Sequence, residues 1–191
     1  MRSPPLIAAA MLLAISGCAE MTGPPQSNPS VRPSTDVAVQ RNGNFVSIVG
    51  PRRQHSETFL GVPNTNYYAL RSLIDTRTGE LRHQLYAEDS YMGAKREYDA
   101  ARDGDGTPLP FAAISTNEIT CDNGCSYAEE FAATLPDPLL RSHPQGLTVA
   151  FTAKSGPELT IAVPGDLIKQ QLAVADDARA SFPAAAAPPP R

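Results

Sequence analysis

The sequence predicts a mainly β protein: one antiparallel sheet system of about eight strands, arranged as a sandwich or a curved barrel, with an α-helix near the C-terminus. Two observations predict the sheets: short runs in which apolar and polar residues alternate, and turn-forming glycine, asparagine and proline residues between these runs. The helix is predicted because apolar residues recur at helical spacing after Pro164-Gly165. A hydrophobic share of 41% over 191 residues is enough for one domain with a buried core.

Two hairpins are predicted in the first half of the chain. Asn42-Gly43 suits the positive φ angles of a tight turn and separates Val37 and Val39 from the run 45–49. Residues 67–74 and 81–87 flank a turn that contains Gly79. We therefore expect two antiparallel strand pairs here.

The second hairpin also assigns side chains to faces. Tyr68, Leu70 and Ile74 share one face because side chains alternate across a strand. His83 is in phase with Leu81, so a packed, hydrogen-bonded core histidine is the preferred interpretation over a catalytic one.

Residues 90–102 fit two structures. Tyr91, Ala94, Tyr98 and Ala101 recur at helical spacing, whereas Gly93 and the neighbouring hairpins favour a bulged strand. We predict the strand, with the helix as the open alternative.

A sharp turn follows at residues 103–107. Two aspartates and two glycines hint at a calcium loop, but Ala101 and Ala112 would fall at ligand positions and cannot coordinate a cation. We therefore expect a plain turn.

Two cysteines mark the centre of a third hairpin, formed by residues 109–120 and 127–135. Cys121 and Cys125 flank the turn sequence Asp122-Asn-Gly124. In an oxidising compartment two such cysteines pair, so we predict a Cys121–Cys125 disulfide that fixes the register of this hairpin. A redox-active pair is the alternative, although the three-residue spacing differs from that of thioredoxin motifs.

The clearest alternation occurs in residues 146–153 and 159–163, which predict a fourth hairpin. The helix follows, with Asp166 as its expected N-cap. Asp176-Asp177 lies near the negatively polarised C-terminus of this helix and predicts fraying there. The β-rich domain is thus expected to span residues 36–182.

The start of the chain has the layout of an export signal. Arg2 precedes the apolar run 6–15, which is shorter than the roughly 20 residues that a transmembrane helix needs. Ile15-Ser-Gly-Cys18 then resembles the lipobox of bacterial lipoproteins, which is an apolar residue, two small residues and a cysteine.

This resemblance covers residues 1–18. It implies that residues 1–17 are a lipoprotein signal peptide, that Cys18 is lipidated, and that its amino group is then acylated with a fatty acid such as palmitate. Two or three acyl chains hold a protein stably on a bilayer. Ala19, where an aspartate would be a retention signal, implies transfer to the outer membrane.

Two segments are expected to lie outside the folded domain. Residues 18–35 contain four prolines and few large apolar side chains, which predicts a tether behind the lipid anchor. Residues 183–191 are rich in alanine and proline and are expected to form a disordered tail.

Several functional classes lack support in the sequence. A net charge of −4 without a basic cluster argues against a nucleic-acid partner. His55, His83 and His143 are widely spaced, and Gly-x-Ser-x-Gly, zinc-helix and nucleotide-binding motifs are absent. Glu129 and Glu130 are adjacent, so on a strand they point to opposite faces. We therefore predict no catalytic residue, no metal ligand and no cofactor.

The sequence-based hypothesis is a non-catalytic lipoprotein, anchored in the outer membrane through Cys18, whose domain faces the periplasm and interacts with an envelope protein partner. A binding module for a small lipid or glycan is one alternative. An envelope enzyme or thiol redox protein is the other.

Overall fold

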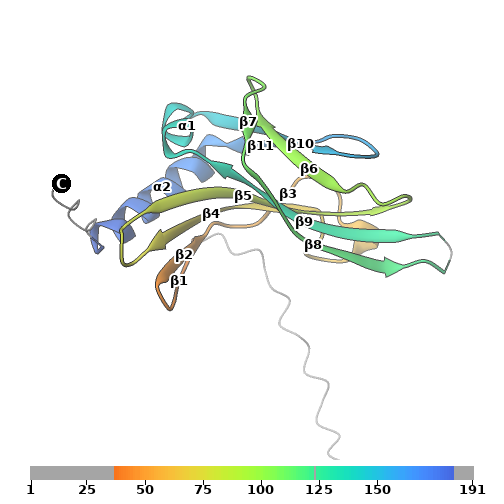
Figure 1. The fold of residues 1–191 in the computed structure, drawn as a ribbon, viewed down its shortest axis with the longest axis horizontal. Coiled ribbons are helices and arrows are strands. Elements are labelled where there is room, and N and C mark those ends of the chain that lie inside the picture. Colours follow the sequence, from red (N-terminus) through yellow and green to blue (C-terminus); the bar gives the residue numbers. More distant parts are fainter. Residues whose placement is uncertain (1–36, 123, 183–191) are drawn as a thin grey trace, which may run out of the picture. The chain divides into compact units, whose positions relative to one another are not determined.

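The computed structural model describes residues 37–122 and 124–182, which form eleven strands, two α-helices and one short 3-10 helix (Figure 1). The strands are β1 (Ala38–Asn42), β2 (Phe45–Val49), β3 (Arg53–Gln54), β4 (Tyr67–Asp75), β5 (Leu81–Met92), β6 (Tyr98–Asp103), β7 (Pro108–Leu109), β8 (Phe111–Thr120), β9 (Ser126–Leu135), β10 (Gly146–Ala153) and β11 (Leu159–Pro164). The helices are η1 (Phe59–Gly61), α1 (Asp137–Ser142) and α2 (Gly165–Ala180). The mainly β fold with a C-terminal helix is confirmed.

The strands form two antiparallel sheets. The larger sheet has the order β1-β2-β4-β5-β9-β8, with β3 also paired to β4, and the smaller has the order β11-β10-β6-β7. Neither sheet closes on itself within the described residues, so the barrel alternative is wrong. The strand number exceeds the predicted eight in part because β3 and β7 have only two residues each.

The two sheets share one hydrophobic core. Phe131 of β9 lies between two aromatic rings of the smaller sheet, with centroid distances of 4.3 Å to Tyr98 and 4.8 Å to Phe151. Tyr68 and Leu70 are buried in the same core, as their alternation predicted. The arrangement is therefore a sandwich, held by residues that alternate inward on both sheets.

All four predicted hairpins form. The pairs that close them are Asn42 with Phe45, Ile74 with Leu81, Thr120 with Ser126, and Phe151 with Leu159. Turn residues and alternation thus fixed the local pairings of the sheets.

The helix α2 packs against strands of both sheets, namely β2, β4, β10 and β11. Its buried side chains include Leu167, Ile168 and Ala175. The predicted N-cap is wrong: Pro164 occupies that position and Asp166 lies in the first turn. Gly165 is required there, because an added Cβ atom would lie only 2.4 Å from the carbonyl oxygen of Pro144.

The expected fraying at Asp176 is also wrong, since α2 continues to Ala180. Arg141 of α1 donates two hydrogen bonds to the Asp176 carboxylate, at 2.7 and 3.0 Å. This ion pair offsets the repulsion between an acidic side chain and the helix C-terminus.

Residues 90–102 are extended and not helical, but they are not one bulged strand. β5 ends at Met92 in the larger sheet, and β6 begins at Tyr98 in the smaller one. The connection 93–97 therefore joins the two sheets, and Gly93 adopts a φ angle of 111° where it leaves β5. The next turn is plain, as predicted: Asp103 Oδ1 accepts hydrogen bonds from the backbone N–H groups of Asp105 and Thr107.

The predicted signal peptide (1–17), the anchor and tether (18–35) and the tail (183–191) lie outside the described residues. Within the described residues, none of the helices has the length and apolar character needed to cross a membrane.

Candidate functional site

The hairpin of β8 and β9 carries the features that favour an interaction with another molecule. β8 is the last strand of the larger sheet, so among residues 37–122 and 124–182 no strand pairs with its outer side (Figure 1). The Cys121 and Cys125 sulfur atoms are bonded in the turn, directly beyond the last strand pair, Thr120 with Ser126. The predicted disulfide thus closes the tip of this hairpin.

The backbone of β9 shows which side of each residue is paired. Thr134 donates its N–H to the carbonyl oxygen of Pro110 at 2.8 Å, so its backbone groups point toward β8. Cys125, by contrast, accepts a 2.8 Å hydrogen bond from Gly93 on the β5 side. Because backbone groups alternate along a strand, even-numbered residues of β9 face β8 and odd-numbered ones face β5.

This alternation identifies the open backbone groups of β8. Ala113, Thr116 and Glu118 lie opposite odd-numbered residues of β9, so their N–H and C=O groups point away from the sheet. Ser115 and Asn117 lie opposite even-numbered residues and pair with β9. The register shifts at positions 114 and 119 leave a regular segment between them, residues 115–118.

The two bulge residues of β8 expose apolar side chains at either end of this segment. Ile114 is 45% exposed and Ile119 is 50% exposed. A bulge redirects a side chain and interrupts pairing, so strand addition here is limited to a short segment.

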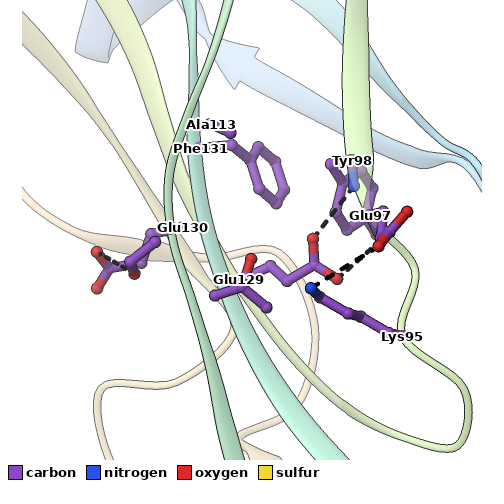
Figure 2. Close-up of a pocket in the computed structure, with 9 residues that line it drawn as sticks. Lys95, Glu97, Tyr98, Ala113, Glu129, Glu130 and Phe131 are labelled. Atoms are coloured by element: carbon purple, nitrogen blue, oxygen red, sulfur yellow. Dashed lines mark hydrogen bonds and ion pairs between the residues drawn. The ribbon is translucent and has the colours of Figure 1, made fainter.

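A pocket of about 210 Å³ lies beside the inner face of this edge (Figure 2). Its walls come from β8, β9, the 93–97 connection and the first residue of β6, and Figure 2 shows the Glu129 side chain between them. The lining residues are Lys95, Glu97, Tyr98, Ala113, Ser115, Thr116, Glu129, Glu130 and Phe131.

Glu129 is 3% exposed, and its hydrogen-bond donors within the described part of the chain are uncharged. These donors are the Tyr91 hydroxyl and the backbone N–H groups of Glu97 (3.0 Å) and Tyr98 (3.1 Å). Burial and the hydrogen bond to this carboxylate raise the pKa of Tyr91, which keeps the phenol protonated as a donor. Glu129 therefore fixes the connection between the two sheets and leaves a buried negative charge at the pocket.

A second carboxylate lies beside it on the same face. Asp89 pairs with Glu129 across β5 and β9 and forms a 2.5 Å ion pair with Arg96. It also accepts a 2.8 Å hydrogen bond from the hydroxyl of Tyr98. The positive charge of Arg96 thus neutralises Asp89, and this pair has a structural role in the interior.

Glu130 points to the opposite side of β9 from Glu129, as predicted for adjacent strand residues (Figure 2). Its carboxylate accepts a 3.1 Å hydrogen bond from the hydroxyl of Ser115. On that same outer face Glu88 is buried, and burial raises its pKa. The backbone N–H of Asn66 donates to Glu88 at 2.5 Å.

The structure also assembles a serine, a histidine and an aspartate that the sequence did not bring together. Ser72 Oγ lies 2.7 Å from His83 Nδ1, and His83 Nε2 lies 3.1 Å from Asp137 Oδ1. Gln171 Nε2 donates to Ser72 Oγ at 2.8 Å, so the serine hydroxyl is free to donate to the histidine. His83 then carries its hydrogen on Nε2, and this N–H group donates a hydrogen bond to Asp137.

These three residue types are those of a catalytic triad, but here a substrate has no access to them. Ser72 is 0% exposed and His83 is 1% exposed, beneath α2. The serine oxygen also accepts a hydrogen bond from the Gln171 amide. A substrate therefore cannot reach this oxygen, as it would have to reach a nucleophile. The chain of hydrogen bonds instead ties the larger sheet to both helices, and His83 is the packed core histidine that the sequence predicted.

No group of three His, Cys, Asp or Glu side chains able to hold a metal ion occurs among residues 37–122 and 124–182. Of the predicted site residues, Cys121 and Cys125 lie at the hairpin tip, whereas Cys18 lies outside the described part of the chain. The open edge of β8 was not predicted. Its one sequence signal is a ten-residue strand without proline, lysine or arginine.

Comparison with known proteins gives no relative for this chain. No protein-family model, no curated protein and no solved structure matches it.

Proposed function

We propose that this protein is a bacterial lipoprotein, anchored in the outer membrane through a lipid on Cys18, that presents its β-sandwich domain to a protein partner in the envelope. The observation that carries the proposal is Ile15-Ser-Gly-Cys18 at the end of the apolar run 6–15. This pattern resembles the lipobox of bacterial lipoproteins, in which the cysteine carries the lipid. The domain then faces the periplasm and acts by binding rather than by catalysis.

The hairpin of β8 and β9 supports the binding role. It offers a strand edge that no described strand pairs with, exposed apolar side chains at Ile114 and Ile119, and a pocket that Ser115 and Thr116 help to line. Such edges are recognition surfaces for other chains when they are not blocked.

Metabolic labelling tests the anchor. The full-length chain, produced in a Gram-negative host fed with labelled palmitate, should take up label and remain with the outer-membrane fraction. Cys18→Ala should lose both label and membrane association. Cys121→Ser is the matched control, because it also removes one cysteine but should retain the label.

The partner is tested by purification from detergent-solubilised membranes of the native producer. The wild-type protein should carry one envelope protein in a stoichiometric amount, and the same complex should be recovered after chemical crosslinking in intact cells. An unlabelled protein in the soluble fraction would refute the anchor, and a protein recovered alone after crosslinking would refute the partner.

A further inference from the structure

We propose that residues 113–119 of β8 bind an extended, lysine- or arginine-containing segment of a partner protein, which adds to the larger sheet as a further strand. This inference rests on the proposed function, and it names the docking surface and the chemistry of the partner. Backbone hydrogen bonds to the edge provide affinity in this mode of binding, and side-chain contacts provide specificity.

The other sheet edges are less suited to strand addition. β7 has two residues and begins with Pro108, and β11 ends with Pro164. β1 carries Arg41, whose guanidinium lies 4.9 Å from the ring centroid of Phe182. Short strands, prolines and basic side chains each block edges, and β8 has none of these three. Its two bulges shorten the segment that can pair but leave residues 115–118 regular.

The open backbone groups of β8 can pair with the backbone of another chain. Thr116 and Glu118 direct their N–H and C=O groups away from β9, and both residues are exposed. An extended segment satisfies these groups in the pattern of an antiparallel or parallel ladder. The bulges at Ile114 and Ile119 limit the added strand to a short stretch and place an apolar contact at each end.

The charge of the partner follows from the charge of the edge. Among the described residues, no ion pair involves Glu118, Glu129 or Glu130. The nearby cations Lys95 and Lys154 both pair with Glu97, at 3.8 and 3.2 Å. Glu118 is therefore an exposed carboxylate on the open edge without a basic partner, and a cationic side chain on an added strand neutralises it. Opposite charges on neighbouring strands stabilise their pairing.

Peptide binding to the full-length protein in detergent tests this inference. The probe is a fluorescent decapeptide of alternating threonine and lysine, capped at both ends. One control peptide replaces each lysine by glutamate. A second keeps every lysine but carries N-methyl groups on alternate backbone nitrogens, so it has the same charge and cannot form a ladder.

The lysine peptide should bind at least about tenfold more tightly than either control, as judged by fluorescence anisotropy. Tenfold corresponds to about 1.4 kcal/mol, the scale of one or two net hydrogen bonds. Equal binding of the N-methylated peptide would overturn the inference, because charge alone would then explain the affinity.

Two proline variants locate the site. Thr116→Pro removes an outward N–H without removing a hydrogen bond to β9, and it should weaken binding by about tenfold or more, the scale of one or two backbone hydrogen bonds. Val39→Pro is the matched control, because Val39 lies on the open side of β1 and is 53% exposed; it should bind as the wild type does. Glu118→Lys leaves every backbone N–H group in place and should also weaken binding. It provides the test if circular dichroism shows that Thr116→Pro does not fold.

Other outcomes identify other occupants. A wild-type dimer in sedimentation that Thr116→Pro dissociates would overturn the inference in favour of a second copy of this chain. If palmitate labels Cys18 and a partner copurifies equally with Thr116→Pro, this inference fails while the proposed function stands. If the lysine peptide binds as expected but Cys18 takes up no label, the anchor fails and the docking edge stands.

Discussion

The interior of the domain accommodates single polar residues through hydrogen bonds, as three buried side chains show: Ser72, His83 and Gln171. Each is at most 1% exposed, and each forms hydrogen bonds with groups on other elements. Gln171 is a polar residue in the buried face of α2, and it also donates a hydrogen bond to the carbonyl oxygen of Ile48 at 3.0 Å. These hydrogen bonds explain why a polar side chain is accommodated there. A buried polar group that lost its partner would destabilise the fold by about 1–3 kcal/mol.

The burial of His83 predicts a pH dependence of stability. Desolvation lowers its pKa below the ordinary value of 6.5, so below pH 6.5 the unfolded chain binds a proton that the folded chain does not. The free energy of unfolding therefore falls as the pH drops through 6.5 toward the folded-state pKa.

Thermal unfolding of the wild type and of His83→Gln, at pH 7.5 and at pH 5.0, measures this contribution. The midpoint should fall less between these pH values in the variant, which does not titrate there. Asp137 and Asp176 face the histidine, but their pKa values are lowered from 3.8 and lie outside this range. The pKa of Glu88 is raised, so its titration stabilises the folded state as the pH falls, which is the opposite effect. This contribution is the same in both proteins. An equal loss in both proteins would contradict the assignment to His83.

At the scale of elements, the Glu129 side chain helps to hold the connection between the two sheets. Glu129 of β9 accepts hydrogen bonds from the backbone N–H groups of Glu97 and Tyr98. These two residues lie where the connection from β5 enters β6. Glu129→Gln would direct an amide NH₂ at one of these donors, so we expect a loss of about 2 kcal/mol in the free energy of unfolding.

Urea unfolding measures this loss, and amide hydrogen exchange locates it. The N–H groups of Glu97 and Tyr98 should exchange faster in the Glu129→Gln variant. Glu130→Gln is the matched control, since the neighbouring carboxylate points to the other face. A loss of stability with unchanged exchange at residues 97 and 98 would show that the effect lies elsewhere.

The disulfide at the tip of the β8–β9 hairpin should stabilise the fold only modestly. Cys121 and Cys125 close a loop of five residues, for which the chain-entropy model gives about 2 kcal/mol. The double variant with serine at both positions should lose about this amount in urea unfolding and keep its cooperative transition. A loss of the whole fold would show that the bridge supports more than the hairpin.

At the scale of the whole molecule, local sequence patterns predicted most of the fold. Alternation and turn residues located the four hairpins, and helical spacing located α2. These signals are contained within about ten residues. The division of residues 90–102 between two sheets was missed, because it depends on a hydrogen bond between the Tyr98 N–H and Glu129, which lies 31 positions away in sequence.

The candidate site was less predictable for the same reason. The cysteine pair is local and was predicted, whereas an open strand edge depends on which strand happens to have no neighbour. The contact of His83 with Asp137 spans 54 positions, and that of Gln171 with Ser72 spans 99. No local periodicity contains such information, so the buried hydrogen-bond chain could not be foreseen.

The mass of the intact protein extracted from membranes is the sharpest test of the lipid anchor on Cys18. If the protein is a lipid-anchored docking domain, its polypeptide begins at Cys18, and the added mass corresponds to a diacylglyceryl group with or without a third acyl chain. A polypeptide that begins elsewhere, or that carries an unmodified residue 18, would contradict the account.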